Sequence, residues 1–457
     1  MAITSPNRRQ RPPGGGAGQG DDQGGRLPAA LATLARVLDR PLTSYQLVLG
    51  LTALLLSLGL VMVLSASSVT SYTAEGNAYA IFTKQALWVA IGLPAAWVVS
   101  RLPVRVIRGF AWPGLLVSIA MICLTYVPGL GVSVNGNQNW LAVGPVTVQP
   151  SEVAKLAVVL WAADVYARKD ALLDDWRHLL VPVVPVTVLV ALLVVGQRDL
   201  GTALVLFAII LGTLWVVGAP LRLFVGAMLA AVGVLAYLAG TDDERVARIT
   251  TFLDPFSDLQ GGGWQAAHGL FALASGQFFG VGIGASRQKW GTLPAAHTDF
   301  IFAVIGEELG LFGTLVVLAL FGLLAFTGFR IATRTTVPFV RYAACGITLW
   351  LLAQAVINLG MVLGFLPVIG IPLPLVSYGG SALVPTLVAL GMLLAFATTE
   401  PGARAALAAR RRGRGRRIGA GLRAGVGTGG LQAGAGAVAG AGRRLRSGIR
   451  MRRRVAR

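Results

Sequence analysis

Long apolar runs with almost no charged positions fill the chain between residues 45 and 400, and short polar segments separate them. A helix needs about 20 mostly apolar residues to cross the hydrocarbon core of a bilayer. Runs of this kind predict ten transmembrane helices, approximately at residues 45–66, 80–100, 104–126, 151–167, 179–196, 200–218, 222–240, 300–328, 341–364 and 381–398. The pattern therefore predicts an all-α integral membrane protein with about ten spans.

The longest segment between predicted helices is residues 241–299, which separates the seventh helix from the eighth. It is not uniformly polar, because the stretch from His268 to Gly284 contains Phe271, Phe278 and Phe279. Such a stretch is typical of short helices that lie at the membrane face or dip partly into it. A second, smaller segment between predicted helices, 127–150, is rich in Gly, Asn, Val and Pro and is also expected to lie outside.

Composition agrees with this class of protein. Hydrophobic residues make up 55% of the 457 positions and charged residues only 13%, and mean hydropathy is +0.71. A soluble enzyme, a disulfide-rich secreted domain and a disordered chain are all excluded, since soluble domains carry roughly 25% charged residues. The two cysteines lie in apolar runs and the three histidines are scattered, so no metal-ligand spacing appears.

The formal net charge of +20 lies almost entirely in the two ends of the chain. Residues 401–457 hold sixteen arginines and no acid, and residues 1–44 hold six arginines against three aspartates. We expect both segments to be disordered basic tails, with the Arg/Gly/Ala-rich C-terminal tail near anionic lipid. The nearly neutral region 45–400 gives no reason to expect nucleic-acid binding.

Lysine and arginine near the helix ends predict the orientation, because cytoplasmic loops carry an excess of these residues. With the N-terminus inside, both tails and most loop arginines lie on the cytoplasmic side. The segment 241–299 then lies outside. We therefore predict a multi-pass protein of the bacterial cytoplasmic membrane with both termini in the cytoplasm.

Charged residues inside or at the ends of membrane spans are costly and usually functional or paired. Asp299, at the outer start of the eighth predicted helix, is either a capping residue that complements the helix dipole or a general base facing outward. Glu152 and Lys155, three positions apart, can pair on one helix face. Asp199 could cap the sixth helix. The eight charged positions of this kind are Glu152, Lys155, Asp164, Arg198, Asp199, Asp299, Glu307 and Glu308.

Several other patterns favour packing over chemistry. The spacing of Gly306 with Gly310, and of Gly360 with Gly364, is typical of helices that approach closely. At least one of Glu307 and Glu308 must face the interior of the bundle. The glycine-rich run 280–284 follows no strand and lacks a Gly-Lys-Ser/Thr ending, so it does not indicate nucleotide binding. The residues alone leave three classes open: a lipid-facing transferase, a transporter or a scaffold.

A set of motifs, in order over residues 45–400, resembles the SEDS family of shape, elongation, division and sporulation proteins. The motifs are Gln149-Pro150-Ser151-Glu152 with Ala154-Lys155, Asp199-Leu200-Gly201-Thr202, Phe252-Leu253-Asp254-Pro255-Phe256, Gly263-Trp264-Gln265, Gly280 to Gly284, Gln288-Lys289, Leu293-Pro294 to Gly310, Asn358-Leu359-Gly360, Gly364-Phe365-Leu366-Pro367 and Leu373 to Ser381. The tails fall outside the resemblance.

This resemblance implies a peptidoglycan glycosyltransferase that polymerises lipid II on the outer face of the membrane. It implies that Asp299 is the essential general base, and that the cations Arg245, Arg248, Arg287 and Lys289 stabilise the departing diphosphate, with or without a divalent ion such as Mg or Mn. Residues expected to bind substrate are Arg245, Arg248, Lys289, His297, Glu152, Lys155, Asp199, Ser377, Tyr378, Gly379 and Gly380.

The chain departs from the family pattern at four positions. Family members often carry glutamate at Ala295 and an acidic residue near Gly291, a lysine in some members corresponds to Ile369, and the usual proline in the Asp199 turn is Arg198. These departures affect the expected lipid II contacts, and not the base itself.

The context Ala296-His297-Thr298-Asp299 and the long tails resemble the division members of the family more than the elongation members. The resemblance then implies septal localisation, a class B penicillin-binding protein as transpeptidase partner, and further division proteins. The alternatives are an elongation polymerase, a lipid II flippase or transporter, and a non-catalytic scaffold.

Overall fold

The structure, a computed structural model, describes residues 40–134, 137–144, 146–240, 252, 254–259, 261–403 and 405–409. The predicted tails therefore lie mostly outside the described residues, and so do Arg245 and Arg248. The chain divides after Ala403 into two compact units, and the membrane-spanning helices belong to the first.

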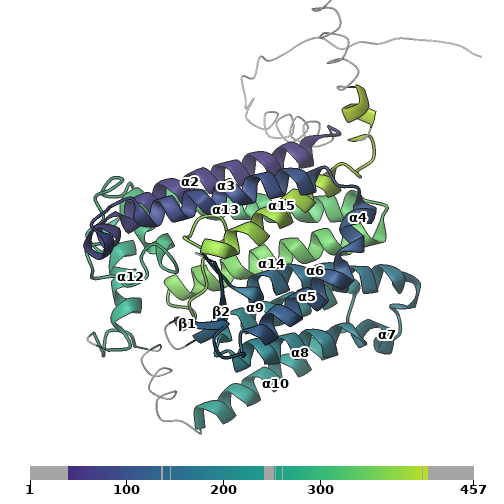
Figure 1. Ribbon diagram of the computed structural model, residues 1–457, viewed down its shortest axis with the longest axis horizontal. Helices are drawn as coiled ribbons and strands as arrows, with labels where there is room; N and C mark the ends of the chain where they lie inside the picture. The colour runs from purple at the N-terminus through teal and green to yellow at the C-terminus, as the bar shows by residue number, and fades with distance from the viewer. Residues whose placement is uncertain are drawn as a thin grey trace, which may run out of the picture. The chain divides into compact units, whose positions relative to one another are not determined.

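Each of the ten predicted spans is helical, with two of them divided by a short interruption (Figure 1). The helices are α2 (Thr43–Glu75), α3 (Ala80–Ser100), α4 and α5 (Val104–Gly109 and Ala111–Leu124), α6 (Pro150–Arg168), α7 and α8 (Trp176–Leu180 and Val183–Gly196), α9 (Leu200–Val217), α10 (Leu221–Gly240), α13 (Ile301–Arg334), α14 (Pro338–Val362) and α15 (Leu383–Ala397). Short 3-10 turns precede α7 at Asp170–Leu172 and α15 at Gly380–Ala382.

Seven helices of the described residues are long and apolar enough to cross a membrane, and they establish a multi-span membrane protein. They are α2, α3, the pair α7–α8, α9, α13, α14, and α15 together with the 3-10 turn before it. Among the remaining predicted spans, α5 has only 14 residues, whereas α6 carries charged residues along its length. Because nearly all of α6 is buried inside the protein, its sequence is not selected for contact with lipid.

The buried helices α6 and α14 form the centre of the bundle. The helix α14 packs against α13, α6 and α9, while α3 packs against α15 and α2 against α13. Figure 1 shows α2, α3, α13 and α15 side by side, with α14, α6 and α5 beneath them. Small residues permit these approaches: a Cβ on Gly391 of α15 would lie 2.5 Å from the Ala96 carbonyl oxygen of α3.

A small antiparallel sheet lies within the segment 127–150, where the all-α prediction includes no strand. Its strands are β1 (Gly131–Val134), β2 (Asn137–Val143) and β3 (Val146–Val148), in the order β1-β2-β3. The strands are too short, and too close to turn residues, for alternation in the sequence to reveal them. Within the segment 241–299, a short helix of the expected kind is confirmed as α12 (Trp264–Ser275).

The helix α13 breaks at Gly310, which has φ 67° and ψ −165°. A Cβ there would lie 2.4 Å from the Gly280 backbone nitrogen, so the backbone at the break packs directly against the turn that follows α12. Gly306 does allow the close approach we expected, since its Cβ would meet the Leu273 side chain of α12. The prediction was wrong for Gly364, which lies after α14 with φ 76° and forms part of a loop.

Candidate active site

Asp299 lies immediately before α13, at the point where three segments meet. The N-cap of α13 is Phe300 and makes no side-chain cap, so the structure does not support the capping alternative for Asp299. Its carboxylate faces the loop after α14: a Cβ placed on Gly370 would lie only 3.5 Å from Oδ2 of Asp299. The amide Nδ2 of Asn358 donates to the carbonyl oxygens of Asp299 (2.8 Å) and Ile371 (2.7 Å), which holds that loop in place.

The carboxylate of Asp299 has no hydrogen-bond or ion-pair partner among the residues that the structure describes. Burial alone raises the pKa of Asp299 to about 6, because desolvation disfavours the charged form. Burial also lowers the pKa of His297, two residues earlier, so this ring is neutral near pH 7. The site therefore holds one unpaired carboxylate whose pKa lies close to neutrality, as general-base catalysis requires.

The second signature lies beside the first. The backbone nitrogen of Tyr378 donates to the His297 carbonyl oxygen at 2.9 Å, and the two rings lie 5.8 Å apart. The Ser377 hydroxyl accepts from the backbone nitrogen of Leu373 at 2.8 Å. Gly380 adopts φ 49° at the start of the turn into α15. The structure thus brings together five of the predicted substrate-binding residues, namely His297, Ser377, Tyr378, Gly379 and Gly380.

A buried polar network on α6 and α14 supports the same loop from below. Lys155 Nζ donates to Glu152 Oε1 at 2.7 Å and to Gln354 Oε1 at 3.2 Å, which confirms the expected ion pair. Gln354 in turn donates to the carbonyl oxygen of Pro372 at 3.1 Å. Sequence reasoning missed the positioning role of Gln354 and Asn358, although amides four positions apart in an apolar helix were a usable signal.

Asp199 is a fully engaged helix cap. Its Oδ1 accepts from the Thr202 backbone nitrogen, and its Oδ2 accepts from Thr202 Oγ1, Asn139 Nδ2 and Gln149 Nε2, each at 2.9 Å. Arg198 has φ 64°, which proline cannot adopt, so the departure from the family pattern accompanies a different local turn. The first turn of α9 nevertheless contacts the loop that faces Asp299, because Gly201 packs against Ile369.

Lys289 is buried and serves a structural ion pair. Its Nζ donates to Glu308 Oε1 (3.2 Å), Ser65 Oγ (3.2 Å) and the Gly284 carbonyl oxygen (2.6 Å). The Glu307 carboxylate accepts from the backbone nitrogen of Arg287 at 2.8 Å, so both glutamates face the interior, as expected for at least one. This arrangement leaves no N–H of Lys289 for a substrate anion, whereas the Arg287 side chain is exposed.

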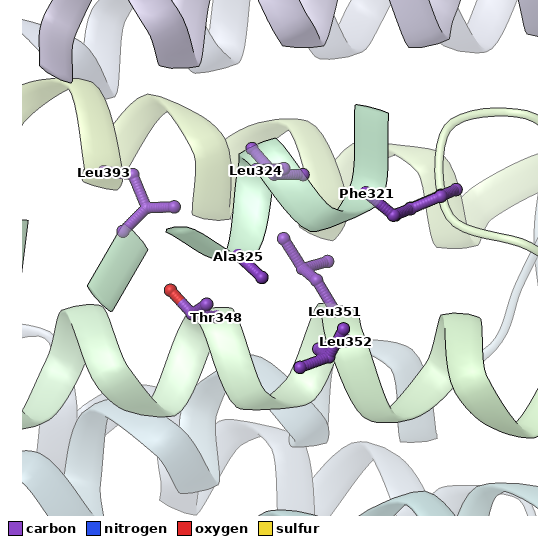
Figure 2. Close-up of a pocket in the computed structure, with 7 residues that line it drawn as sticks. All are labelled: Phe321, Leu324, Ala325, Thr348, Leu351, Leu352 and Leu393. Atoms are coloured by element: carbon purple, nitrogen blue, oxygen red, sulfur yellow. The ribbon is translucent and has the colours of Figure 1, made fainter. Parts of the chain in front are cut away.

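An apolar cavity between α13, α14 and α15 is separate from this site (Figure 2). Its volume of about 10 Å³ suits no more than one water molecule. Its lining residues are Phe321, Leu324, Ala325, Thr348, Leu351, Leu352 and Leu393. None of them belongs to the predicted site, and Thr348 directs its hydroxyl to the Ala344 carbonyl of its own helix. A sugar substrate cannot bind there.

Comparison with known proteins gives one consistent family. The model of the family FtsW/RodA/SpoVE, described as "Cell cycle protein", matches residues 45–401. The chain is 45% identical over 374 residues to the probable peptidoglycan glycosyltransferase FtsW of Mycobacterium tuberculosis, covering 82% of this chain and 71% of that one. The protein of the same name in Legionella pneumophila is 36% identical over 371 residues, covering 80% and 94%.

Solved structures agree. A chain from work described as "Structural coordination of polymerization and crosslinking by a peptidoglycan synthase complex" has a TM-score of 0.63 and 30% identity, covering 78% of this chain and 97% of that one. The rod shape determining protein RodA of Thermus thermophilus has a TM-score of 0.57 and 29% identity, covering 77% and 96%.

Proposed function

The chain belongs to the FtsW/RodA/SpoVE family of cell cycle proteins, the SEDS family, and we propose that Asp299 is its catalytic general base. It is a membrane-embedded peptidoglycan glycosyltransferase of the FtsW type. The observation that carries the catalytic assignment is the half-buried carboxylate of Asp299, unpaired among the described residues, with a pKa of about 6 and beside the backbone of Gly370.

In the proposed reaction the Asp299 carboxylate takes the proton of the 4-hydroxyl of the acceptor N-acetylglucosamine. That oxygen bonds to C1 of the donor's N-acetylmuramic acid with inversion, while the bond from C1 to the diphosphate oxygen breaks. Undecaprenyl diphosphate leaves with the electron pair. One base suffices, because a diphosphate departs without a proton from the enzyme, unlike the alkoxide of glycoside hydrolysis.

The charge of the leaving diphosphate needs cationic partners. Arg287 is exposed on the same outer segment and supports this role, and Arg245 and Arg248, which lie outside the described residues, remain candidates. Lys289 is the exception, since Glu308, Ser65 and Gly284 already occupy its ammonium group. The described residues around Asp299 do not fit a protein-built Mg or Mn site, because no three acidic, His or Cys side chains among them converge. No step of the proposed reaction is routed through such an ion.

The division role rests on the relatives. Curated proteins at 45% and 36% identity carry the name FtsW, and a similar solved chain comes from a peptidoglycan synthase complex. We therefore propose that the chain acts at the septum with a class B penicillin-binding protein and other division proteins, with both termini in the cytoplasm. Lipid II is its proposed substrate.

Purified protein in detergent with lipid II tests the base. The change Asp299→Asn should leave a folded protein whose polymerisation rate falls by roughly 10²–10⁴-fold. The control Asp174→Asn removes an exposed aspartate on the α6–α7 connection and should polymerise at the wild-type rate. Glycan chains formed in detergent also distinguish a polymerase from a flippase, which has no measurable action without a bilayer. A near-normal rate for Asp299→Asn would make the assignment wrong.

A further inference from the structure

Two phenylalanines of the outer segment are unusually exposed. Phe278 and Phe279 follow α12 and are 69% and 88% exposed, respectively. Gly280, Gly282 and Gly284 follow with positive φ, so the aromatic pair stands at the tip of a tight turn. Large apolar side chains that are exposed together mark a surface that contacts lipid or another protein.

This turn is continuous with the outer end of a transmembrane helix. The backbone nitrogen of Leu311 donates to the Gln277 carbonyl at 2.8 Å, and that of Phe312 donates to the Phe278 carbonyl at 3.2 Å. Phe312 is itself 67% exposed. Phe278, Phe279, Leu311 and Phe312 therefore form one surface, which we call the outer apolar patch.

The depth of the outer apolar patch follows from helix geometry. Arg330 lies near the cytoplasmic end of α13, and Phe312 precedes it by 18 positions, which is roughly 27 Å at 1.5 Å per residue. The hydrocarbon core is about 30 Å thick. Exposed positions between the two, including Leu315, Leu323 and Phe326, are apolar, as expected of a face that contacts lipid. The outer apolar patch thus lies at the outer boundary of the hydrocarbon and extends that face.

The same turn is bonded to the segment that carries Asp299. The backbone nitrogens of Val281 and Gly282 donate to the carbonyl oxygens of Glu307 (2.9 Å) and Glu308 (3.0 Å), in the part of α13 before the Gly310 break. That part begins at Ile301, two residues after Asp299. Backbone hydrogen bonds therefore join the turn to the first two turns of α13, which directly follow Asp299.

We propose that Phe278 and Phe279 insert into the outer leaflet and set the height of Asp299 above the membrane. The partner of the outer apolar patch is the lipid hydrocarbon, because the patch continues the lipid-facing side of α13. The consequence for catalysis rests on the proposed function: the diphosphate of a polyprenyl-linked donor lies in the headgroup layer, so the base must be held at a matching height.

Fluorescence quenching in liposomes tests the insertion. In a Cys123→Ala/Cys345→Ala background, Phe279→Cys carries an NBD fluorophore, and Gln138→Cys, an exposed position on β2, carries the same label as control. Phosphatidylcholine with a doxyl group near the headgroup should quench the label at 279 at least about two-fold more than the control. Quenching by aqueous iodide at 279 equal to the control, without a doxyl effect, would overturn the insertion.

Activity in two environments tests the height. The double change Phe278→Ser/Phe279→Ser should lower lipid II polymerisation about 10-fold in liposomes but little in detergent micelles, where no bilayer fixes the substrate. The control Tyr79→Ser removes another exposed aromatic at the outer end of α3. Wild-type activity of the double variant in liposomes would make the height role wrong, while the role of Asp299, tested in detergent, would stand.

Discussion

Two aspartates at opposite ends of the bundle, Asp164 buried and Asp299 half-buried, have opposite surroundings. Asp164, near the C-terminal end of α6, is fully buried and accepts from Arg108 Nε (2.5 Å), Arg168 Nε (2.8 Å) and Trp112 Nε1 (3.0 Å). Asp299 has none of these partners among the described residues. A carboxylate whose lone pairs are occupied stabilises the fold, whereas one left unpaired keeps a raised pKa and can accept a proton from a substrate.

The largest test of this contrast compares the two residues directly. Asp299→Asn should lower the polymerisation rate by roughly 10²–10⁴-fold without lowering the unfolding temperature in detergent. Asp164→Ala should instead lower the free energy of unfolding by about 3 kcal/mol, because it leaves Arg108 and Trp112 without their buried acceptor. The folded fraction of this variant should polymerise normally. Loss of rate without loss of stability in Asp164→Ala would contradict the division of roles.

The next effect concerns the loop that faces Asp299. Asn358→Ala removes the donor that joins the Asp299 and Ile371 carbonyls, so the base should shift relative to the substrate. We expect the maximal rate of polymerisation to fall about 10-fold or more, since small misplacements of reacting groups are costly. Thr348→Val, which lines the apolar cavity of Figure 2, is the matched buried control. Equal rates for both variants would exclude a positioning role for Asn358.

The pH profile of polymerisation gives a smaller, graded effect. Because burial raises the pKa of Asp299 to about 6, the base is ionised above that pH and protonated below it. The rate should therefore reach half its plateau near pH 6 and fall about 10-fold per pH unit below it. Asp299→Glu should move this midpoint. A flat profile between pH 5 and 8 would show that another group limits the rate.

The smallest effect is expected at the surface. Glu75, at the end of α2, and Lys84, near the start of α3, pair at 2.7 Å, but both side chains are about half exposed to solvent. Exposed ion pairs typically contribute at most about 1 kcal/mol. Lys84→Gln should therefore change the unfolding temperature by no more than a few degrees, measured against the large change expected for Asp164→Ala. A drop in the unfolding temperature as large as that of Asp164→Ala would show that solvent exposure does not weaken the Glu75–Lys84 pair.

Much of the fold could be predicted from local patterns in the sequence. The apolar runs predicted where every span begins to within a few residues, although α2 and α13 extend beyond their predicted ends, since each helix must satisfy its own backbone in lipid. The Glu152–Lys155 pair followed from a spacing of three residues, and the capping alternative for Asp199 followed from Thr202 three positions later. These interactions form within a single helical turn, so the sequence contains both partners side by side.

The distant contacts could not be predicted in this way. Ser65 and Lys289 meet Glu308 across three segments, Asn139 reaches Asp199 from a sheet that the sequence did not indicate, and the Gly310 break depends on a turn thirty residues earlier. No periodicity records which helix lies beside which. Such contacts exist only after packing has chosen the neighbours of each face.

Asp299 shows where the two sources of information separate. The sequence by itself determined that an aspartate directly precedes the eighth predicted span, and the motif around it indicated a base. By position alone, however, a helix cap was the favoured explanation. Only the tertiary structure placed Phe300 at the cap, brought the backbone of Gly370 to the carboxylate and left it without a described partner. The sequence fixes which ionisable group is available, but the pKa and reactivity of a carboxylate depend on the neighbours that the fold supplies or withholds.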